Sequence, residues 1–169
     1  MMRRSPLDRV ALAAGLRELP FLAQLDIRSE TPPASLPIEP NTVTGDGTRG
    51  ALWLGPDEWL VVGPPGSERQ LEAEFVASGA TVVDVSANRT ALELRGRRVG
   101  ELLEFGCPID LDPRVFGPGC CAQTLLARAN VLIWFVTDVP EPVYRLLVRP
   151  SFATYVAAWL ADAAEGLID

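Results

Sequence analysis

The chain has 169 residues and a formal net charge of −7, and it contains neither His nor Lys. Its 15 basic side chains are all Arg, set against 22 Asp and Glu. A His general base, a Schiff-base Lys and a zinc site with His ligands are therefore excluded within this chain. Arg cannot replace these groups as a base, because its guanidinium stays protonated. The acidic balance also argues against nucleic acid or an anionic membrane as a partner.

The length fits one domain or two small lobes, and the hydrophobic fraction of 48% is ordinary for a globular protein. No stretch is long and apolar enough to cross a bilayer. The paired Arg3 and Arg4 precede an apolar run, residues 10–16, that ends at Arg17. This run is too short for a typical export signal, so we expect a cytoplasmic protein.

The first fifty residues predict an N-terminal arm, a strand and a loop. Residues 1–18 form the expected arm, and residues 19–28 predict a half-buried strand because Leu25 and Ile27 alternate with charged neighbours. Residues 31–50 begin with a proline-rich segment and continue with polar residues and Gly. Proline disfavours both helix and central strand, so this segment is expected to be a surface loop or a lobe boundary.

Residues 51–165 are expected to form the main body. A hairpin is predicted from residues 51–54 and 58–62, and a helix from Ser67, which has the spacing of a capping box with Gln70 and a stop at Gly79. Further elements are predicted as strands at 81–85 and 90–94, a short helix ending at Gly106, strands at 123–129 and 131–136 joined near Asn130, a strand at 143–148 and a last helix from Ser151. This order favours an α+β fold with mainly antiparallel sheets, packed helices and two small lobes.

The most concentrated polar stretch between predicted strands is residues 84–89. Ser86, Asn88 and Arg89 have the chemistry to hold a carboxylate or a carbonyl-rich ligand. Asp and Asn at such places more often cap a turn, and that structural interpretation is favoured here. Asp110 and Asp112 could likewise share a proton in acid-base work, but in a Pro-rich loop a turn is the better interpretation.

The three cysteines are Cys107, Cys120 and Cys121. An odd number with two adjacent residues is a poor disulfide framework, and the spacing matches no common zinc pattern. We expect small buried hydrophobic residues in a reducing compartment, and rank a redox role of Cys120 and Cys121 last.

Tryptophan and arginine supply the remaining candidates. The four tryptophans belong to the core or, where exposed, anchor a partner, and the Arg-rich segment 95–98 suits an anion site, a solvated face or an interface. No Gly-rich phosphate motif is present, so no dinucleotide site is indicated. We assign no catalytic, cofactor-binding or metal residue, and the candidate partner contacts are Trp53, Trp59, Arg89, Arg95, Arg97 and Arg98.

Seven segments carry a resemblance, in order along nearly the whole chain: residues 4–7, 19–25, 53–60, 83–90, 106–111, 121–126 and 149–155. Together they resemble the gamma subunit of heterotetrameric sarcosine oxidase. The resemblance does not extend to residues 31–50, and Cys120 departs from the pattern. More distantly, residues 84–111 resemble the folate-binding fold of the glycine-cleavage aminomethyltransferase, without a match to that enzyme's catalytic carboxylate.

The resemblance implies a complex that oxidatively demethylates sarcosine to glycine, with hydrogen peroxide and formaldehyde, or methylene-tetrahydrofolate when folate is present. It implies alpha, beta and delta subunits as partners, which would hold FAD, FMN, NAD, zinc and tetrahydrofolate, with no cofactor in this chain. Residues 1–169 would then form one non-catalytic gamma-subunit domain. The alternative is a free-standing folate-binding protein of the aminomethyltransferase type.

Overall fold

The computed structural model describes residues 4–167 and contains two five-stranded sheets. Sheet 1 has the order β3 (Val43–Gly45), β4 (Gly50–Gly55), β5 (Glu58–Gly63), β2 (Ala23–Arg28) and β6 (Thr81–Asp84). Sheet 2 has the order β1 (Leu16–Leu19), β7 (Thr90–Arg95), β10 (Val143–Val148), β9 (Ala129–Thr137) and β8 (Cys121–Leu126). Every neighbouring pair in these two sheets is antiparallel. The expected α+β class with antiparallel sheets is confirmed.

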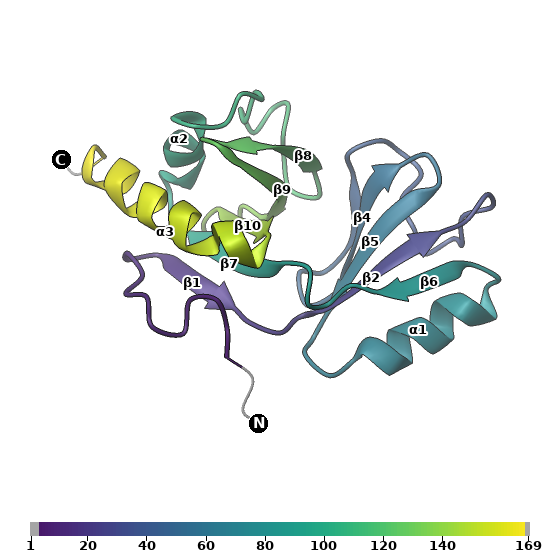
Figure 1. Cartoon of the computed structure of the whole chain (residues 1–169). Coiled ribbons are helices and arrows are strands. Elements are labelled where there is room, and N and C mark those ends of the chain that lie inside the picture. Colours follow the sequence, from purple (N-terminus) through teal and green to yellow (C-terminus); the bar gives the residue numbers. More distant parts are fainter. Residues whose placement is uncertain (1–3, 168–169) are drawn as a thin grey trace.

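Three helices cover the outer faces of the two sheets (Figure 1). Helix α1 (Glu68–Ala77) buries Leu71 and Phe75 in a cluster with the outer face of sheet 1. Helices α2 (Val99–Glu104) and α3 (Pro150–Glu165) pack in a second cluster against the outer face of sheet 2. The layers therefore run helix, sheet, sheet, helix.

The inner faces of the two sheets meet in a third apolar cluster. Sheet 1 contributes Leu52, Leu60 and Val62, and sheet 2 contributes Ala91, Cys121, Leu132, Trp134 and Leu147. Successive side chains of a strand point to opposite faces, so the intervening residues of the same strands fill the outer clusters. Trp59, next to Leu60, accordingly lies on the α1 side.

The N-terminal region supplies one strand to each sheet. Strand β1 pairs with β7, whereas β2 lies between β5 and β6. The strand expected over residues 19–28 is β2, which begins only at Ala23, and the expected arm over residues 1–18 contains most of β1. The break between the two strands falls at Pro20 and Phe21. Proline lacks the N–H of a ladder, and Phe21 takes a left-handed φ of 61°. The expected loop over residues 31–50 also contains the short strand β3.

Two local predictions were wrong. Ser67 makes no side-chain cap with helix α1, because its φ of −89° and ψ of 5° are not the extended backbone usual for an N-cap residue, and its hydroxyl donates to the Pro64 carbonyl oxygen at 2.7 Å. The turn between β8 and β9 lies at residues 127–128 rather than near Asn130, and Ala127 adopts the positive φ of 52° that tight hairpin turns need. Gly79, with a φ of +84°, does end α1 as predicted.

Candidate functional site

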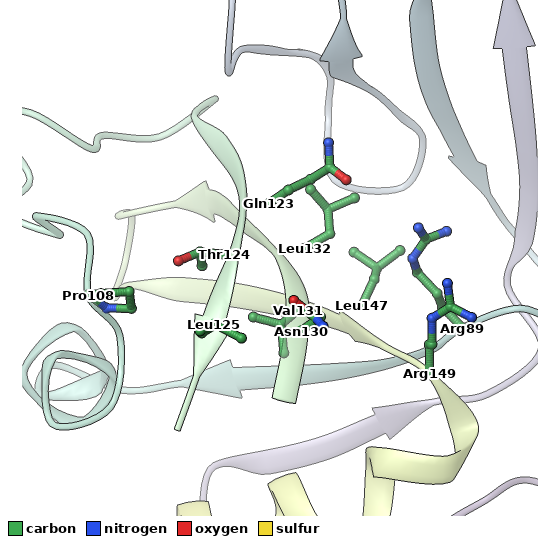
Figure 2. Close-up of a pocket in the computed structure, with 10 residues that line it drawn as sticks. All are labelled: Arg89, Pro108, Gln123, Thr124, Leu125, Asn130, Val131, Leu132, Leu147 and Arg149. Atoms are coloured by element: carbon green, nitrogen blue, oxygen red, sulfur yellow. The ribbon is translucent and has the colours of Figure 1, made fainter. Parts of the chain in front are cut away.

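A cavity of about 480 Å³ opens on the inner face of sheet 2, at one end of its strands (Figure 2). Its lining includes the side chains of Arg89, Gln123, Asn130, Leu132, Leu147 and Arg149. Leu132 and Leu147 are buried, whereas Gln123, Asn130 and Arg149 are exposed. The cavity thus has an apolar floor and polar sides.

Strand pairing explains why these side chains come together. Leu147 pairs with Ala91 on one side and with Leu132 on the other, and Leu132 pairs with Gln123. Arg89 lies two residues before Ala91, and Arg149 lies two residues after Leu147. A period of two places both arginines in the next row of the same face. The apolar cluster between the sheets includes Ala91, Leu132 and Leu147 but not this outer row.

The two arginines at the cavity have no acidic partner. Within residues 4–167, neither the Arg89 nor the Arg149 guanidinium forms an ion pair or a side-chain hydrogen bond. Burial lowers the pKa of Arg89, the positive charge of Arg149 lowers it further, and the more remote Asp26 and Glu58 oppose this. The cavity therefore has a positive edge in a chain of net negative charge.

On the same face, the row beyond Ala91 and Leu147 carries a buried ionic cluster. Glu93 is 3% exposed and accepts from Arg17 at 2.7 Å and from Arg145 at 3.1 Å. Arg145 also lies 5.0 Å from the Trp134 ring centroid and donates to the Gly47 carbonyl oxygen. Burial alone would raise the pKa of Glu93, but the hydrogen bond and charge of Arg145, together with Arg17, lower it overall. This cluster is satisfied internally.

The polar stretch at residues 84–89 divides into a turn and one cavity residue. The Ser86 hydroxyl donates to Asp84 Oδ1 at 2.5 Å, its N–H donates to the same oxygen at 2.9 Å, and its Oγ accepts from the Gln24 N–H at 3.0 Å. These contacts fit the structural interpretation of Ser86. Of the three residues considered as ligand-binding groups, only Arg89 lines the cavity.

The other candidate partner contacts lie apart from this cavity. Trp59 is 1% exposed and its indole N–H donates to the Pro37 carbonyl oxygen at 2.7 Å, so it is a core residue with no surface to offer a partner. Trp53 is half-buried. Arg95, Arg97 and Arg98 are exposed at the opposite end of β7 from Arg89.

Two of these arginines are engaged within the chain. Arg98 forms an ion pair with Glu101 at 3.0 Å and donates to the Leu167 carbonyl oxygen at 2.6 Å. Arg95 Nη2 lies 3.6 Å from Glu93. Segment 95–98 is therefore not a single cluster of unpaired guanidinium groups.

The acidic and sulfur-containing candidates have structural roles. Asp112 pairs with Arg114 at 2.5 Å, which lowers the Asp112 pKa to about 2, and its N–H donates to Asp110 at 2.9 Å. Burial raises the pKa of the Cys121 thiol to about 12. Residues 4–167 contain no group of three His, Cys, Asp or Glu side chains placed to hold a metal ion. No helix in that range has the length and hydropathy to traverse a membrane.

Sequence reasoning missed Arg149, Gln123 and Asn130 as cavity residues. These residues share a face because side chains alternate with a period of two along β8, β9 and β10. This alternation brings them together only once the registers between the strands are known. Asn130 was assigned to a turn, whereas it lies in β9 and faces the cavity.

Comparison with known proteins identifies the family. Residues 33–166 match the model of the sarcosine oxidase gamma subunit family, so the match includes most of the segment 31–50 that the resemblance had omitted. A sarcosine oxidase subunit gamma from Corynebacterium sp. strain P-1 is 38% identical, and one from Arthrobacter sp. is 36% identical. Each alignment covers 96% of this chain and 90% of the relative.

Two solved structures share the fold. A chain of the heterotetrameric sarcosine oxidase from Corynebacterium sp. U-96, in complex with pyrrole 2-carboxylate, matches with a TM-score of 0.82 and 33% identity over 97% of this chain and 95% of that chain. The glycine cleavage system aminomethyltransferase T from Bartonella henselae matches with a TM-score of 0.63 and 13% identity over 86% of this chain and 45% of that enzyme. The second likeness concerns the fold alone. The family match and the identity to these relatives show that the chain belongs to the sarcosine oxidase gamma subunit family.

Proposed function

We propose that this chain is the non-catalytic gamma subunit of a heterotetrameric sarcosine oxidase. The observation that carries the proposal is the match to a chain of that solved complex over 97% of this chain and 95% of the other. A match over both full lengths supports an equivalent subunit rather than a shared fragment. The free-standing folate-binding alternative rests on a likeness at 13% identity, which concerns the fold only, so the subunit role is preferred.

In this proposal the partners are the alpha, beta and delta subunits, and the complex acts in the cytoplasm. It demethylates sarcosine oxidatively to glycine, with hydrogen peroxide and formaldehyde, or with methylene-tetrahydrofolate when folate is present. FAD, FMN, NAD, zinc and tetrahydrofolate belong to the partner subunits. The absence of His and Lys from the chain supports this division, because it removes the usual bases and several cofactor anchors.

The proposed contribution of the chain is to pack against its partners and help to fix the assembly. Trp53, Arg95, Arg97 and Arg98 remain the proposed contacts, whereas Arg89 lines the cavity described above. Helix α3 adds two aromatic side chains, Phe152 and Tyr155, that are each 39% exposed and three residues apart on one helix face. Paired exposed aromatic side chains are typical of interfaces.

Co-expression tests the subunit role. The chain carries an affinity tag and is expressed with the genes of the other three subunits from the same organism. We expect a yellow complex with three further polypeptides that oxidises sarcosine. The same tagged chain expressed alone is the control, and it should lack a flavin absorbance band. Recovery of the tagged chain alone from the co-expression, or a flavin band on the lone chain, contradicts the proposal.

A further inference from the structure

We propose that the cavity at Arg89 and Arg149 binds the carboxylate of a small organic acid whose apolar body lies on Leu125, above the buried Leu132 and Leu147. The proposal adds a ligand site to this chain and does not depend on the subunit role argued above. It rests on the placement of two guanidinium groups, an apolar floor and polar sides around one cavity of about 480 Å³.

The charges at the cavity lack compensation from the chain itself. Figure 2 shows the Arg89 and Arg149 side chains next to each other at one end of the cavity, and each charge acts on the other. The contrast with Arg145 is informative, because that guanidinium, which lies two rows away on the same face, is paired with Glu93 at 3.1 Å. Arg89 is partly buried beside the like charge of Arg149, and Asp26 and Glu58 offset this only in part, so an anion between the two guanidinium groups relieves the repulsion.

Guanidinium groups select the chemistry of that anion. Each presents a planar fork of donors that matches a carboxylate or a phosphate in a bidentate arrangement. The lining favours the carboxylate of a partly apolar acid, because the Leu125 side chain is 42% exposed at the cavity and Leu132 and Leu147 are buried beneath it. Gln123, Thr124 and Asn130 supply hydrogen-bonding groups on the remaining sides.

Size argues for a small molecule rather than an inserted acidic side chain. Small-molecule cavities commonly measure about 300–1,000 Å³, and this one falls within that range. A single Asp or Glu of a partner subunit would neutralise the arginines but would leave the exposed Leu125 side chain open to water. An acid with an aromatic or aliphatic body covers both.

Calorimetric titration with 2-naphthoate tests the site, with its neutral isostere 2-naphthamide as the second probe. The protein is used in the form in which it purifies, as the assembled complex or as the lone chain. We expect 2-naphthoate to bind, and Arg89→Gln and Arg149→Gln each to raise its Kd about tenfold, the loss expected for one charge-assisted hydrogen bond. Arg69→Gln, which removes an exposed arginine on α1, is the matched control and should leave the Kd unchanged.

Several results would overturn the site. One is binding of 2-naphthoate that is equal in wild type and in both arginine variants, and another is equally tight binding of 2-naphthamide. Tighter binding of inorganic phosphate through the same arginines would refute the carboxylate assignment. Loss of partner subunits from Arg89→Gln or Arg149→Gln, but not from Arg69→Gln, would assign the cavity to a partner's acidic group. Arg149 is exposed, so its variant should fold even if the Arg89 variant does not.

The two proposals fail separately. A wild-type complex that assembles but does not bind 2-naphthoate refutes only the ligand site. A chain that never assembles with the other subunits but binds 2-naphthoate through Arg89 and Arg149 refutes only the subunit role.

Discussion

Arg145 on β10 and Glu93 on β7 form a buried ion pair, with Nη2 and Oε2 at 3.1 Å and side chains 14% and 4% exposed. The same Arg145 stacks over Trp134 and donates to the Gly47 carbonyl oxygen in the loop between β3 and β4. One side chain therefore connects the inner face of sheet 2 with a loop of sheet 1. The pair is part of what holds the two sheets in their relative position.

Removing one member of this pair should destabilise the protein. We expect Arg145→Met to lower the free energy of unfolding by about 3 kcal/mol, because the Glu93 carboxylate then lies buried with weaker compensation from Arg17 and Arg95. Urea unfolding at pH 7 provides the measurement. Arg69→Met, at an exposed position of α1, is the control and should change the free energy by less than about 0.5 kcal/mol.

A double-mutant cycle with Glu93→Gln separates the pair from its surroundings. The double variant should lose less stability than the sum of the two single variants, since the second change no longer leaves a buried charge alone. Additive losses would show that Arg145 stabilises the fold through Trp134 and Gly47 and not through Glu93.

The stability contributed by Glu93 should depend on pH. Its pKa in the folded chain is lowered from the ordinary value of 4.5, chiefly because Arg145 overcomes the opposing effect of burial. The contribution is then complete above about pH 4.5 and is lost as the pH falls through the lowered folded pKa. The difference in unfolding free energy between wild type and Glu93→Gln should therefore shrink between pH 5 and pH 3, about the range over which an Asp or Glu with a lowered pKa titrates.

Comparing wild type with Glu93→Gln cancels the titration of the other carboxylates. Asp112 and Glu74 also have lowered pKa values, through Arg114 and Arg49 respectively, but both titrate equally in the two proteins. A difference between wild type and variant that stays constant from pH 7 to pH 3 would contradict the role given to Glu93.

Gly50 should not tolerate even one additional methyl group. A Cβ at this position would lie 2.6 Å from the Trp134 ring, and both residues are buried between the sheets. Gly50→Ala should destabilise by about 2 kcal/mol, because the ring or the strand has to shift. Gly100→Ala is the matched change, since the added Cβ would lie 3.8 Å from Tyr144 and Gly100 is within helix α2. It should stabilise by about 0.5–1 kcal/mol, and thermal unfolding of both variants decides.

Thiol reactivity should separate the three cysteines. Cys121 is 0% exposed and burial raises its pKa to about 12, so it should not react with a disulfide reagent at pH 8 in the native protein. Cys120 is partly exposed and should react first, and all three thiols should react after unfolding. Mass spectrometry of the labelled peptides locates each modification, and Cys120→Ser is the control. Rapid native labelling of Cys121 would contradict its placement in the core.

Hydrophobic patterning predicted most of the secondary structure, because the strands and helices place apolar side chains in the three clusters at the spacing typical of each element. The strand at residues 143–148 and the helix after Pro150 follow from this pattern directly. The break at Phe21 and the turn at Ala127 could not be predicted, since both depend on a positive φ at a residue that rarely adopts it. The Ser67 capping box failed because the backbone of Ser67, with φ −89° and ψ 5°, does not take the extended conformation usual for an N-cap residue.

The cavity was only partly accessible to sequence reasoning. The sequence names Arg89 as a residue able to hold a carboxylate and favours a turn-capping role for the Asp and Asn of residues 84–89, and Asp84 does accept two hydrogen bonds from Ser86. Arg149 lies 60 positions away along the chain and joins Arg89 only because β10 pairs with β7. Long-range register of this kind is set by tertiary packing, which local patterns do not encode.

The distribution of strands has a consequence for how the chain folds during synthesis. All five strands of sheet 1 lie within residues 23–84, so this sheet can form before the second half of the chain leaves the ribosome. Strand β1 has to wait for β7, and β7 for β10 near residue 148. During that interval Leu52, Leu60 and Val62 have no partner layer. The nascent chain therefore passes through a stage with a bare apolar sheet face, when it is most exposed to aggregation and most in need of a chaperone.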